Sequence, residues 1–253
     1  MNQKQRRELI AEAIKIKGSI STQEISQEFG ISKMTVGRDL KELESEGIIE
    51  LYHGGAMYKG ASMLEYPMSI KSDLFVEEKK RIGKVAASKI KDGSSIFLET
   101  GTTVMYTALE LVDKRKCNYY TNSLSVMTHL SKVDDLNLHS APGNYRKLSN
   151  GFLGMDTQEY LTNFYFDYCV IGTEGVDSNG RVSLHSEEDA LTKKAVMSRS
   201  KVKILVFDRS KMNKNFLCSI GSIDNFDIVL TDFSDVQEFF SNRKELYSKV
   251  ITV

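Results

Sequence analysis

Apolar positions at helical spacing dominate the start of the chain. Leu9, Ile10, Ala13 and Ile14 mark one face of a first predicted helix. A second apolar stripe follows around Ile25. A third carries residues spaced for a buried helix face: Val36, Leu40 and Leu43. The pattern therefore predicts three short consecutive helices.

Two serines indicate where the second and third helices begin. Ser21 is followed three residues later by Glu24, which is the pattern of a capping box. Ser32 lies in the equivalent position before the third helix, between the apolar residues Ile31 and Val36. Only the turn FGI separates these two helices, and a short turn containing glycine is typical of a helix-turn-helix.

The pattern changes after the third helix. The segments IIELY and AMYK predict two short strands around the tight turn HGG, which is the arrangement of a wing. Residues 1–58 are thus predicted to form a winged helix-turn-helix. Residues 59–75 lack a clean period and contain one of only two prolines, so we interpret them as a linker.

From residue 76 onward, short apolar runs alternate with helical stretches. The runs predicted as strands are SIFLE, NYYTN, LNLHSA, DYCVIG, KILVFD and DIVLTD. Each has the length of a buried strand, and helices lie between several of them, which favours an α/β domain with a mostly parallel sheet. Residues 76–253 are therefore predicted to form a second domain.

Composition places the chain among ordinary globular proteins, with 41% hydrophobic and 27% charged residues. No apolar run is long enough to span a bilayer, and the first residues lack the apolar core of a signal peptide, so we expect a cytoplasmic protein. Three widely separated cysteines suit buried reduced thiols better than disulfides or zinc. The four histidines are too scattered for a metal site, and no cofactor is predicted.

Charge qualifies the helix-turn-helix interpretation. Residues 1–58 contain eight Lys and Arg but nine Asp and Glu. A domain with this balance binds DNA only if its positive charge is concentrated on one face. Glu44, Glu46 and Glu50 must then point away from that face.

The exposed face of the third helix supplies the candidate DNA contacts. Hydroxyls and free N–H groups at a helix N-terminus suit phosphates, and Arg38 and Lys41 reach phosphates or guanine edges. The candidate residues are Ser21, Thr22, Ser32, Lys33, Met34, Thr35, Gly37, Arg38, Lys41, His53 and Gly54. Taken alone, the same pattern also fits a capped helical pair whose charges are merely solvated.

The segment ISTQEISQEFGISKMTVGRDLKELESEGIIELYHGGAMY closely resembles the DNA-binding domain of DeoR-family repressors, with the pattern S-x-x-T-[IV]-R-R-D-L followed by R-x-H-G-G-A. The resemblance implies that double-stranded operator DNA is a partner. Gly37 stands where the family usually has the first of two arginines, and Leu51 stands where the wing usually has an arginine. Gly37 also costs the helix about 0.8–1 kcal/mol relative to alanine. Gly37 therefore either changes the operator preference of the recognition helix or weakens its binding to DNA.

The remainder of the chain resembles the family's C-terminal effector domain, through EEKKRIGKVAASKIKDGSSIFLETGTT, TNS, APGNYRKLSNGFLG, GTEGVDSNG, EEDALTKKAV and FDRSKM. The resemblance implies the fold shared by ribose-5-phosphate isomerase, glucosamine-6-phosphate deaminase and CoA transferases. It also implies a phosphorylated sugar as effector and a homo-oligomer, either dimer or tetramer.

The candidate effector residues follow predicted strands. ETGTT follows a strand and opens a helix, an arrangement that suits a phosphate. The full set is Glu99, Gly101, Thr102, Thr103, Asn122, Gly143, Arg146, Gly175, Asp177, Glu188, Lys193, Asp208 and Lys211. Glu99 replaces the family's usual aspartate, and Pro142 replaces the first glycine of a Gly-Gly loop. Each candidate also has an ordinary interpretation as a turn, a cap or a solvated charge.

Two functions fit these patterns. The first is a DNA-binding transcriptional regulator, a repressor of a carbohydrate-metabolism operon that is controlled by a phosphorylated sugar. The alternative is a sugar-phosphate isomerase or deaminase with a DNA-binding appendage, because Glu99, Asp177 and Asp208 are available as general bases. An enzyme has no need of a winged helix-turn-helix, so the regulator is favoured.

Overall fold

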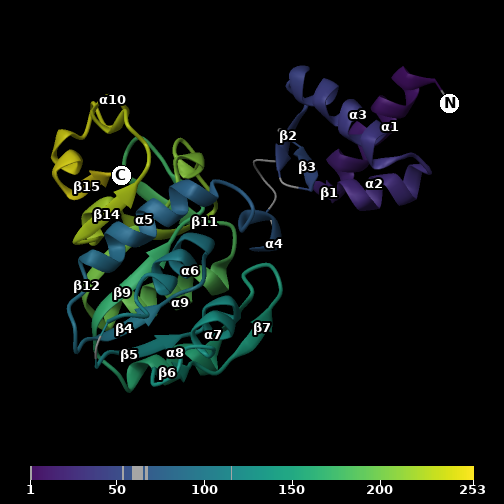
Figure 1. Cartoon of the computed structure of the whole chain (residues 1–253). Coiled ribbons are helices and arrows are strands. Elements are labelled where there is room, and N and C mark those ends of the chain that lie inside the picture. Colours follow the sequence, from purple (N-terminus) through teal and green to yellow (C-terminus); the bar gives the residue numbers. More distant parts are fainter. Residues whose placement is uncertain (1, 53, 59–64, 66–67, 115) are drawn as a thin grey trace. The chain divides into compact units, whose positions relative to one another are not determined.

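The computed structural model describes residues 2–52, 54–58, 65, 68–114 and 116–253 (Figure 1). The chain forms two compact units, Met1–Leu74 and Phe75–Val253. The first contains a helix-turn-helix and the second a parallel sheet covered by helices. The predicted fold class is therefore confirmed.

The first unit contains the three predicted helices and the wing. Its elements are α1 (Gln3–Lys17), β1 (Ser19–Ser21), α2 (Thr22–Phe29), α3 (Lys33–Ser45), β2 (Ile49–Tyr52), β3 (Gly55–Tyr58) and α4 (Met68–Lys71). Both predicted caps are confirmed, because Ser21 Oγ accepts from Glu24 N at 3.1 Å and Ser32 Oγ accepts from Thr35 N at 3.2 Å. The short helix α4 lies in the stretch interpreted as a linker.

Two features of the first unit differ from the sequence prediction. Strand β1 was not predicted, and it pairs antiparallel with β3 to give a three-stranded sheet in the order β1-β3-β2. Leu9 is 48% exposed, whereas Ile10 and Ile14 are fully buried. The buried face of α1 is therefore rotated from the predicted one, because each residue advances a helix by about 100°.

The second unit alternates strands and helices, as its apolar runs predict. Its elements up to β9 are α5 (Val76–Ser88), β4 (Ser95–Leu98), α6 (Thr102–Leu109), β5 (Asn118–Thr121), α7 (Leu124–Leu130), β6 (Asn137–Ser140), β7 (Asn144–Arg146), β8 (Gly151–Leu153), α8 (Met155–Thr162) and β9 (Phe166–Gly172). The rest are β10 (Gly175–Val176), β11 (Arg181–Leu184), α9 (Glu187–Ser198), β12 (Ser200–Val206), η1 (Arg209–Lys211), β13 (Cys218–Ser222), η2 (Ile223–Asn225), β14 (Ile228–Thr231), α10 (Val236–Phe239), η3 (Lys244–Lys249) and β15 (Val250–Thr252).

A seven-stranded parallel sheet forms the centre of this unit, in the order β15-β14-β12-β9-β4-β5-β6. All six predicted strands belong to it, and β15 completes one edge. The antiparallel sheet β10-β11-β13 and the hairpin β7-β8 were not predicted. The chain runs outward from β4 in one direction and from β9 in the other. The boundary between β4 and β9 is thus a topological switch point, where open α/β sheets bind ligands.

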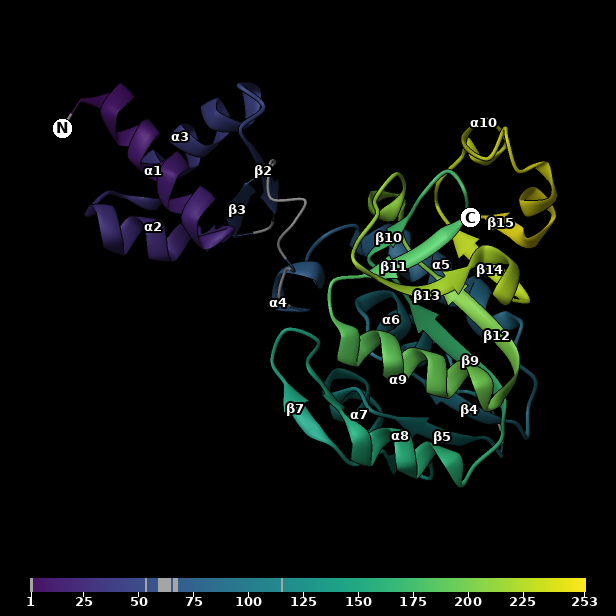
Figure 2. The ribbon, with the colours of Figure 1, turned by 180° about the vertical axis from the view of Figure 1, so that it is seen from behind.

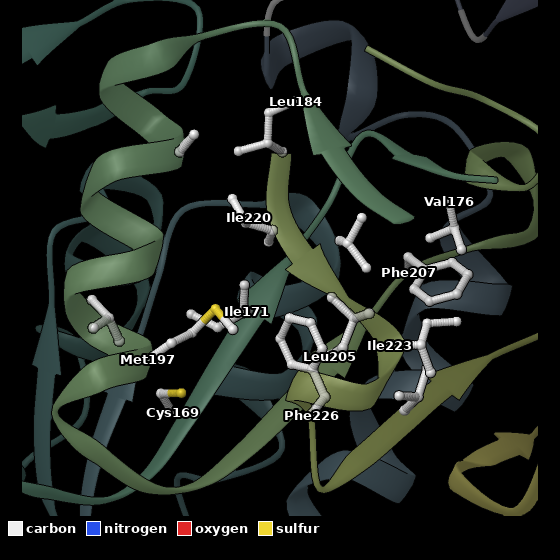
Figure 3. Packing of buried hydrophobic residues seen from close by; sticks show 14 of the residues in the cluster. Cys169, Ile171, Val176, Leu184, Met197, Leu205, Phe207, Ile220, Ile223 and Phe226 are labelled. Carbon is white, nitrogen blue, oxygen red and sulfur yellow. The ribbon is translucent and has the colours of Figure 1, made fainter. Parts of the chain in front are cut away.

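Alternating side chains divide the core between the two faces of the sheet. In β9, Cys169 and Ile171 join the cluster beneath α9, whereas Tyr168 and Val170 join the cluster beneath α5 and α6. Figure 1 shows α5 and α6 over one face, and Figure 2, from behind, shows α8 and α9 over the other. Figure 3 shows Met197 of α9 meeting the β9 side chains.

All three cysteines are unbridged; Cys117 and Cys169 are buried and Cys218 is half-buried. Burial raises the pKa of the Cys169 thiol to about 12.

Among the described residues, no helix is long and apolar enough to cross a membrane, and no group of His, Cys, Asp and Glu could hold a metal ion.

Gly83 sets the distance between α5 and α6. A Cβ at this position would lie 2.8 Å from the backbone nitrogen of Thr107 and 2.8 Å from the carbonyl carbon of Tyr106. We predict that Gly83→Ala lowers the free energy of unfolding by about 1–3 kcal/mol, although alanine is the better helix former. Urea unfolding tests this, with the exposed neighbour in Lys84→Ala as control. Equal stability of the two variants would contradict the close approach.

Candidate functional site

Helix α3 presents one apolar face and one charged face. Its buried residues are Val36, Asp39, Leu40 and Leu43. Lys33, Met34, Arg38 and Lys41 are exposed. The hydroxyls of Ser32 and Thr35 lie 3.0 Å apart and take part in the helix cap. The predicted outward face is therefore formed, but part of its hydroxyl chemistry is used within the helix.

The wing turn is attached to the start of α2. The backbone N–H of Thr22 donates to the carbonyl of Gly54 at 2.7 Å. An open hollow of about 620 Å³ adjoins this contact, and its lining residues are Ser21, Thr22, Gln23, Glu24, Gln27, Lys33 and Gly54. Gln23 and Gln27 were not predicted as site residues. His53, a predicted contact, lies outside the described residues.

Ion pairs neutralise several acidic residues of the first unit. Arg6 holds the buried carboxylate of Asp39 through two hydrogen bonds of 2.6 and 3.1 Å. The pairs Arg7–Glu42, at 3.1 Å, and Lys17–Glu28, at 2.7 Å, remove two more charges.

Two further acidic residues have partners other than the cations of the outward face. Glu46 lies 3.9 Å from Arg7, and Glu44 accepts from the backbone of Leu51. In the described part of the chain, no acidic residue forms an ion pair with any cation of the outward face, namely Lys33, Arg38 and Lys41. A domain with excess acid thus carries a cationic face.

The two departures from the family pattern have different surroundings. Leu51 packs against the core of the first unit, so its apolar side chain contributes to folding. Around Gly37, apart from its chain neighbours and the adjoining backbone of its own helix, no atom of the described structure lies within 4 Å of the position that a Cβ would take. Nothing in its own domain therefore requires glycine at residue 37.

A buried charged cluster lies at the carboxyl edge of the parallel sheet. Glu99 follows β4 and is fully buried. Its Oε1 accepts from Thr100 Oγ1 at 2.7 Å, and its Oε2 forms an ion pair with Lys193 of α9. Burial raises the pKa of Glu99, and the ammonium of Lys193 opposes this shift.

Arg146 and Asp189 extend this cluster. Arg146 Nη1 donates to Ser149 Oγ at 2.7 Å and to Asp189 Oδ2 at 3.2 Å, and Ser149 Oγ donates to the same Oδ2 at 2.7 Å. The charge of Asp189 also contributes to the raised pKa of Glu99. Glu188, the predicted residue, is exposed, so the acidic group of α9 that joins the cluster is its neighbour Asp189.

Asn122 follows β5 at the same edge and is fully buried. Its Nδ2 donates to the carbonyl of Phe152 at 3.1 Å, but its Oδ1 accepts no hydrogen bond from the residues that the structure describes. A Cβ on Gly151 would lie 2.3 Å from the Thr100 side chain and 2.9 Å from the Asn122 carbonyl. The first residue of β8 therefore lies directly against this polar edge.

Gly101 turns the chain from β4 into α6. Its φ of 139° lies in a region that favours glycine. The next residues, Thr102 and Thr103, are buried, with 8% and 6% of their surface exposed. Their backbone N–H groups belong to the first turn of α6, where a helix has no internal acceptors.

Asp208 follows β12 and lies between two lysines. Its Oδ2 is 3.8 Å from Lys79 Nζ and 4.0 Å from Lys211 Nζ. Burial alone would raise the pKa of Asp208, but Lys211, Lys79 and a hydrogen bond from Ser210 together lower it. Lys79 was not predicted, because its partner is distant in sequence.

The neighbouring Arg209 reaches the first residues of α5. Its guanidinium pairs with Glu78 at 3.2 Å and with Asp232 at 2.7 Å, and it lies 5.1 Å from the ring centre of Phe75. Phe75 has a φ of 52°, a strained conformation for an aromatic residue. The loop after β12 thus contacts the first residues of the second unit.

Three predicted effector residues have local structural roles. Asp177 Oδ1 accepts from two backbone N–H groups of its own turn, each at 2.9 Å. A Cβ on Gly175 would lie 2.6 Å from the carbonyl oxygen of Lys214, and one on Gly143 would lie 2.2 Å from Thr157 Oγ1. Turn geometry and close packing account for these residue types.

Comparison with protein families gives two matches. The DeoR-like helix-turn-helix domain matches residues 6–60, and the DeoR C terminal sensor domain matches residues 74–233. The glycerol-3-phosphate regulon repressor of Escherichia coli (strain K12) is 33% identical over 232 residues, covering 92% of each chain. The lactose phosphotransferase system repressor of Staphylococcus epidermidis is 34% identical over 255 residues, covering 100% of each.

Among solved structures, ribose 5-phosphate isomerase A from Neisseria gonorrhoeae is similar to this chain, with a TM-score of 0.41 and 17% sequence identity. The similarity covers 57% of this chain and 55% of that one. At this level it supports no functional argument.

The lysines beside Asp208 predict a specific pH dependence of stability. Because the pKa of Asp208 is lower in the folded chain than its ordinary value of 3.8, its carboxylate adds stability above about pH 4. That contribution is lost as the pH falls through the folded-state pKa. Asp208→Asn also removes the buried carboxylate that lies beside the ammonium groups of Lys79 and Lys211, so we expect a loss of about 3–5 kcal/mol at pH 7.

Urea unfolding between pH 7 and pH 2 measures this effect. The difference between the parent and Asp208→Asn should shrink below about pH 4, whereas the exposed Asp92→Asn should match the parent throughout. A difference that stays constant with pH would contradict the role of the ionised carboxylate.

Proposed function

Because the chain belongs to the DeoR family, we propose that it is a DNA-binding transcriptional repressor of a carbohydrate-metabolism operon, controlled by a phosphorylated sugar. One observation carries the DNA-binding part. The exposed cations of α3 have no acidic partner among the described residues, although the domain as a whole carries an excess of acid. Two of the chain's relatives are named repressors of the glycerol-3-phosphate regulon and of the lactose phosphotransferase system.

We propose that α3 enters the major groove, as the second helix of a helix-turn-helix does. Arg38 would contact base edges or phosphates there. The start of α2 and the wing turn would face the sugar-phosphate backbone, where free N–H groups and Lys33 suit phosphates. Contacts of that kind set the register on the duplex, and the exposed residues of α3 set the sequence preference.

We propose that the carboxyl edge of the sheet binds the effector. The dianion of a sugar phosphate would lie near Thr102, Thr103 and Lys211, because the first turn of α6 offers N–H donors and Lys211 a cation. Sugar hydroxyls would lie near Glu99 and Asn122. The free Oδ1 of Asn122 supports this assignment, since a buried acceptor without a donor is costly.

The loop after β12 offers a path from the effector to the DNA-binding unit. Asp208 and Arg209 contact Lys79 and Glu78 at the start of α5, and residues 59–75 precede that helix. A ligand shifts DNA affinity only if it prefers one arrangement of the chain. A ligand that moves Lys211 would change this loop and, through α5, the end of the linker.

The carboxylates available for catalysis are already engaged. Both oxygens of Glu99 have partners, Asp177 closes its own turn, and Asp208 lies between two lysines. A general base needs a carboxylate free to reach the substrate proton. These contacts favour a regulator that binds a sugar phosphate over an isomerase or deaminase.

We further propose that the repressor acts in the cytoplasm as a homo-oligomer, either dimer or tetramer. One winged helix buries a small area on DNA, and tight specific binding generally uses two half-sites. The oligomer would form mainly through the second unit, so that two DNA-binding units reach repeated or palindromic half-sites.

The DNA interface is tested by removing and adding charge on α3. A duplex enriched by the full chain from a random-sequence pool serves as operator. We expect Arg38→Ala to abolish specific binding and Gly37→Arg to strengthen binding to generic DNA with a steeper salt dependence. Arg7→Ala is the control, because it also removes one arginine, but one that is paired with Glu42. This variant should bind the operator as the parent does. Parent-like operator binding by Arg38→Ala across a salt titration would contradict the placement of α3.

The effector site is tested by the response of operator affinity to phosphorylated sugars. Lys211→Ala should keep operator binding but lose the response, because the proposed phosphate contact is gone. Thr102→Val removes the hydroxyl next to the proposed phosphate site and should weaken the response, and the exposed Lys244→Ala should leave it intact. A parent-like response in both Lys211→Ala and Thr102→Val would remove this edge of the sheet from consideration.

A further inference from the structure

Met34 is an apolar side chain in a position where folding does not need one. It is the second residue of α3 and 71% exposed, whereas the other large apolar residues of the helix are buried. N-terminal residues of the second helix of a helix-turn-helix are those that meet base edges. Met34 therefore lies where a side chain is available for sequence recognition.

Met34, Gly37 and Arg38 form one continuous surface. Residues three and four positions apart share a face of a helix, and Arg38 Nη2 lies 3.9 Å from Met34 Sδ. Between them, Gly37 presents bare backbone with open space beyond it. The neighbouring hydroxyls of Ser32 and Thr35 are occupied by the helix cap. This surface thus offers a thioether, a guanidinium and room for close approach.

The major groove contains a matching set of groups. The apolar group on its base edges is the C5-methyl of thymine, and arginine pairs with the O6 and N7 of guanine. We propose that Met34 reads a thymine methyl next to a guanine read by Arg38, and that Gly37 lets the helix backbone approach these two base pairs closely. This proposal rests on the proposed DNA binding and names the sequence feature that the site reads.

A methionine suits this contact because its unbranched thioether adapts to the position of a methyl group. Glycine is unfavourable in a helix interior, and no packing contact in the described structure requires it here. An arginine at residue 37 would fill the space between Met34 and Arg38. The contact of Met34 with the methyl group and the absence of a side chain at Gly37 therefore act together in recognising the base pairs.

The test removes single methyl groups from the DNA. The full chain first enriches a duplex from a random-sequence pool. The thymines of that duplex are then replaced by deoxyuridine one at a time. We expect one thymine in each half-site at which the replacement weakens binding of the parent about fourfold, the value of one buried methyl. Met34→Ala should bind the thymine and deoxyuridine duplexes equally. Met155→Ala, which removes an exposed methionine of the second unit, should keep the parent's discrimination.

The outcomes separate this proposal from the proposed function. If Met34→Ala discriminates thymine from deoxyuridine as the parent does, Met34 does not read the methyl group. If no single replacement affects the parent while Arg38→Ala still abolishes binding, the thymine proposal fails and the DNA-binding function stands. If the chain enriches no duplex from the pool, both proposals fail.

Discussion

Two buried carboxylates at the carboxyl edge of the parallel sheet organise the second unit. Glu99 and Asp208 are fully buried, and an unpaired charge there would be prohibitively costly. Their cations come from helices on opposite faces of the sheet, Lys193 from α9 and Lys79 from α5 (Figures 1 and 2). Both helical layers are therefore fixed to the same edge, beside the switch point of the strand order.

The same constraint leaves this edge incomplete. Hydrophobic packing satisfies the two faces of the sheet, whereas two buried polar atoms at its edge have no hydrogen-bond partner among the described residues. Asn122 Oδ1 accepts nothing from the described residues, and Asp208 Oδ2 has two lysines near it but no hydrogen bond. A polyhydroxylated anion would supply the missing donors and share the cations. Because the Asp208 loop also holds the start of α5, completing the edge would affect the part of the chain that follows the linker.

The sequence predicted what is encoded locally. Ser21 and Ser32 cap their helices as the spacing indicates, and long apolar runs mark the central strands. Strand β1 was missed because it contributes a single buried residue, Ile20, between two serines. Glu99 and Asn122 were selected as candidates at the ends of predicted strands, and each directly follows a strand of the sheet.

Long-range pairs and helix phase could not be predicted. Arg6 and Asp39 are 33 residues apart, and no period relates Lys79 to Asp208. The family resemblance pointed to Glu188, which is exposed, whereas its neighbour Asp189 faces the core, because one residue rotates a helix by about 100°.

The most direct measurement of the central claim is operator affinity of the unmodified chain with each sugar phosphate and with the same sugar unphosphorylated. The account predicts that one phosphorylated sugar changes the Kd by about fivefold or more while its unphosphorylated form has no effect. Identical binding curves for every phosphorylated and unphosphorylated pair would contradict it.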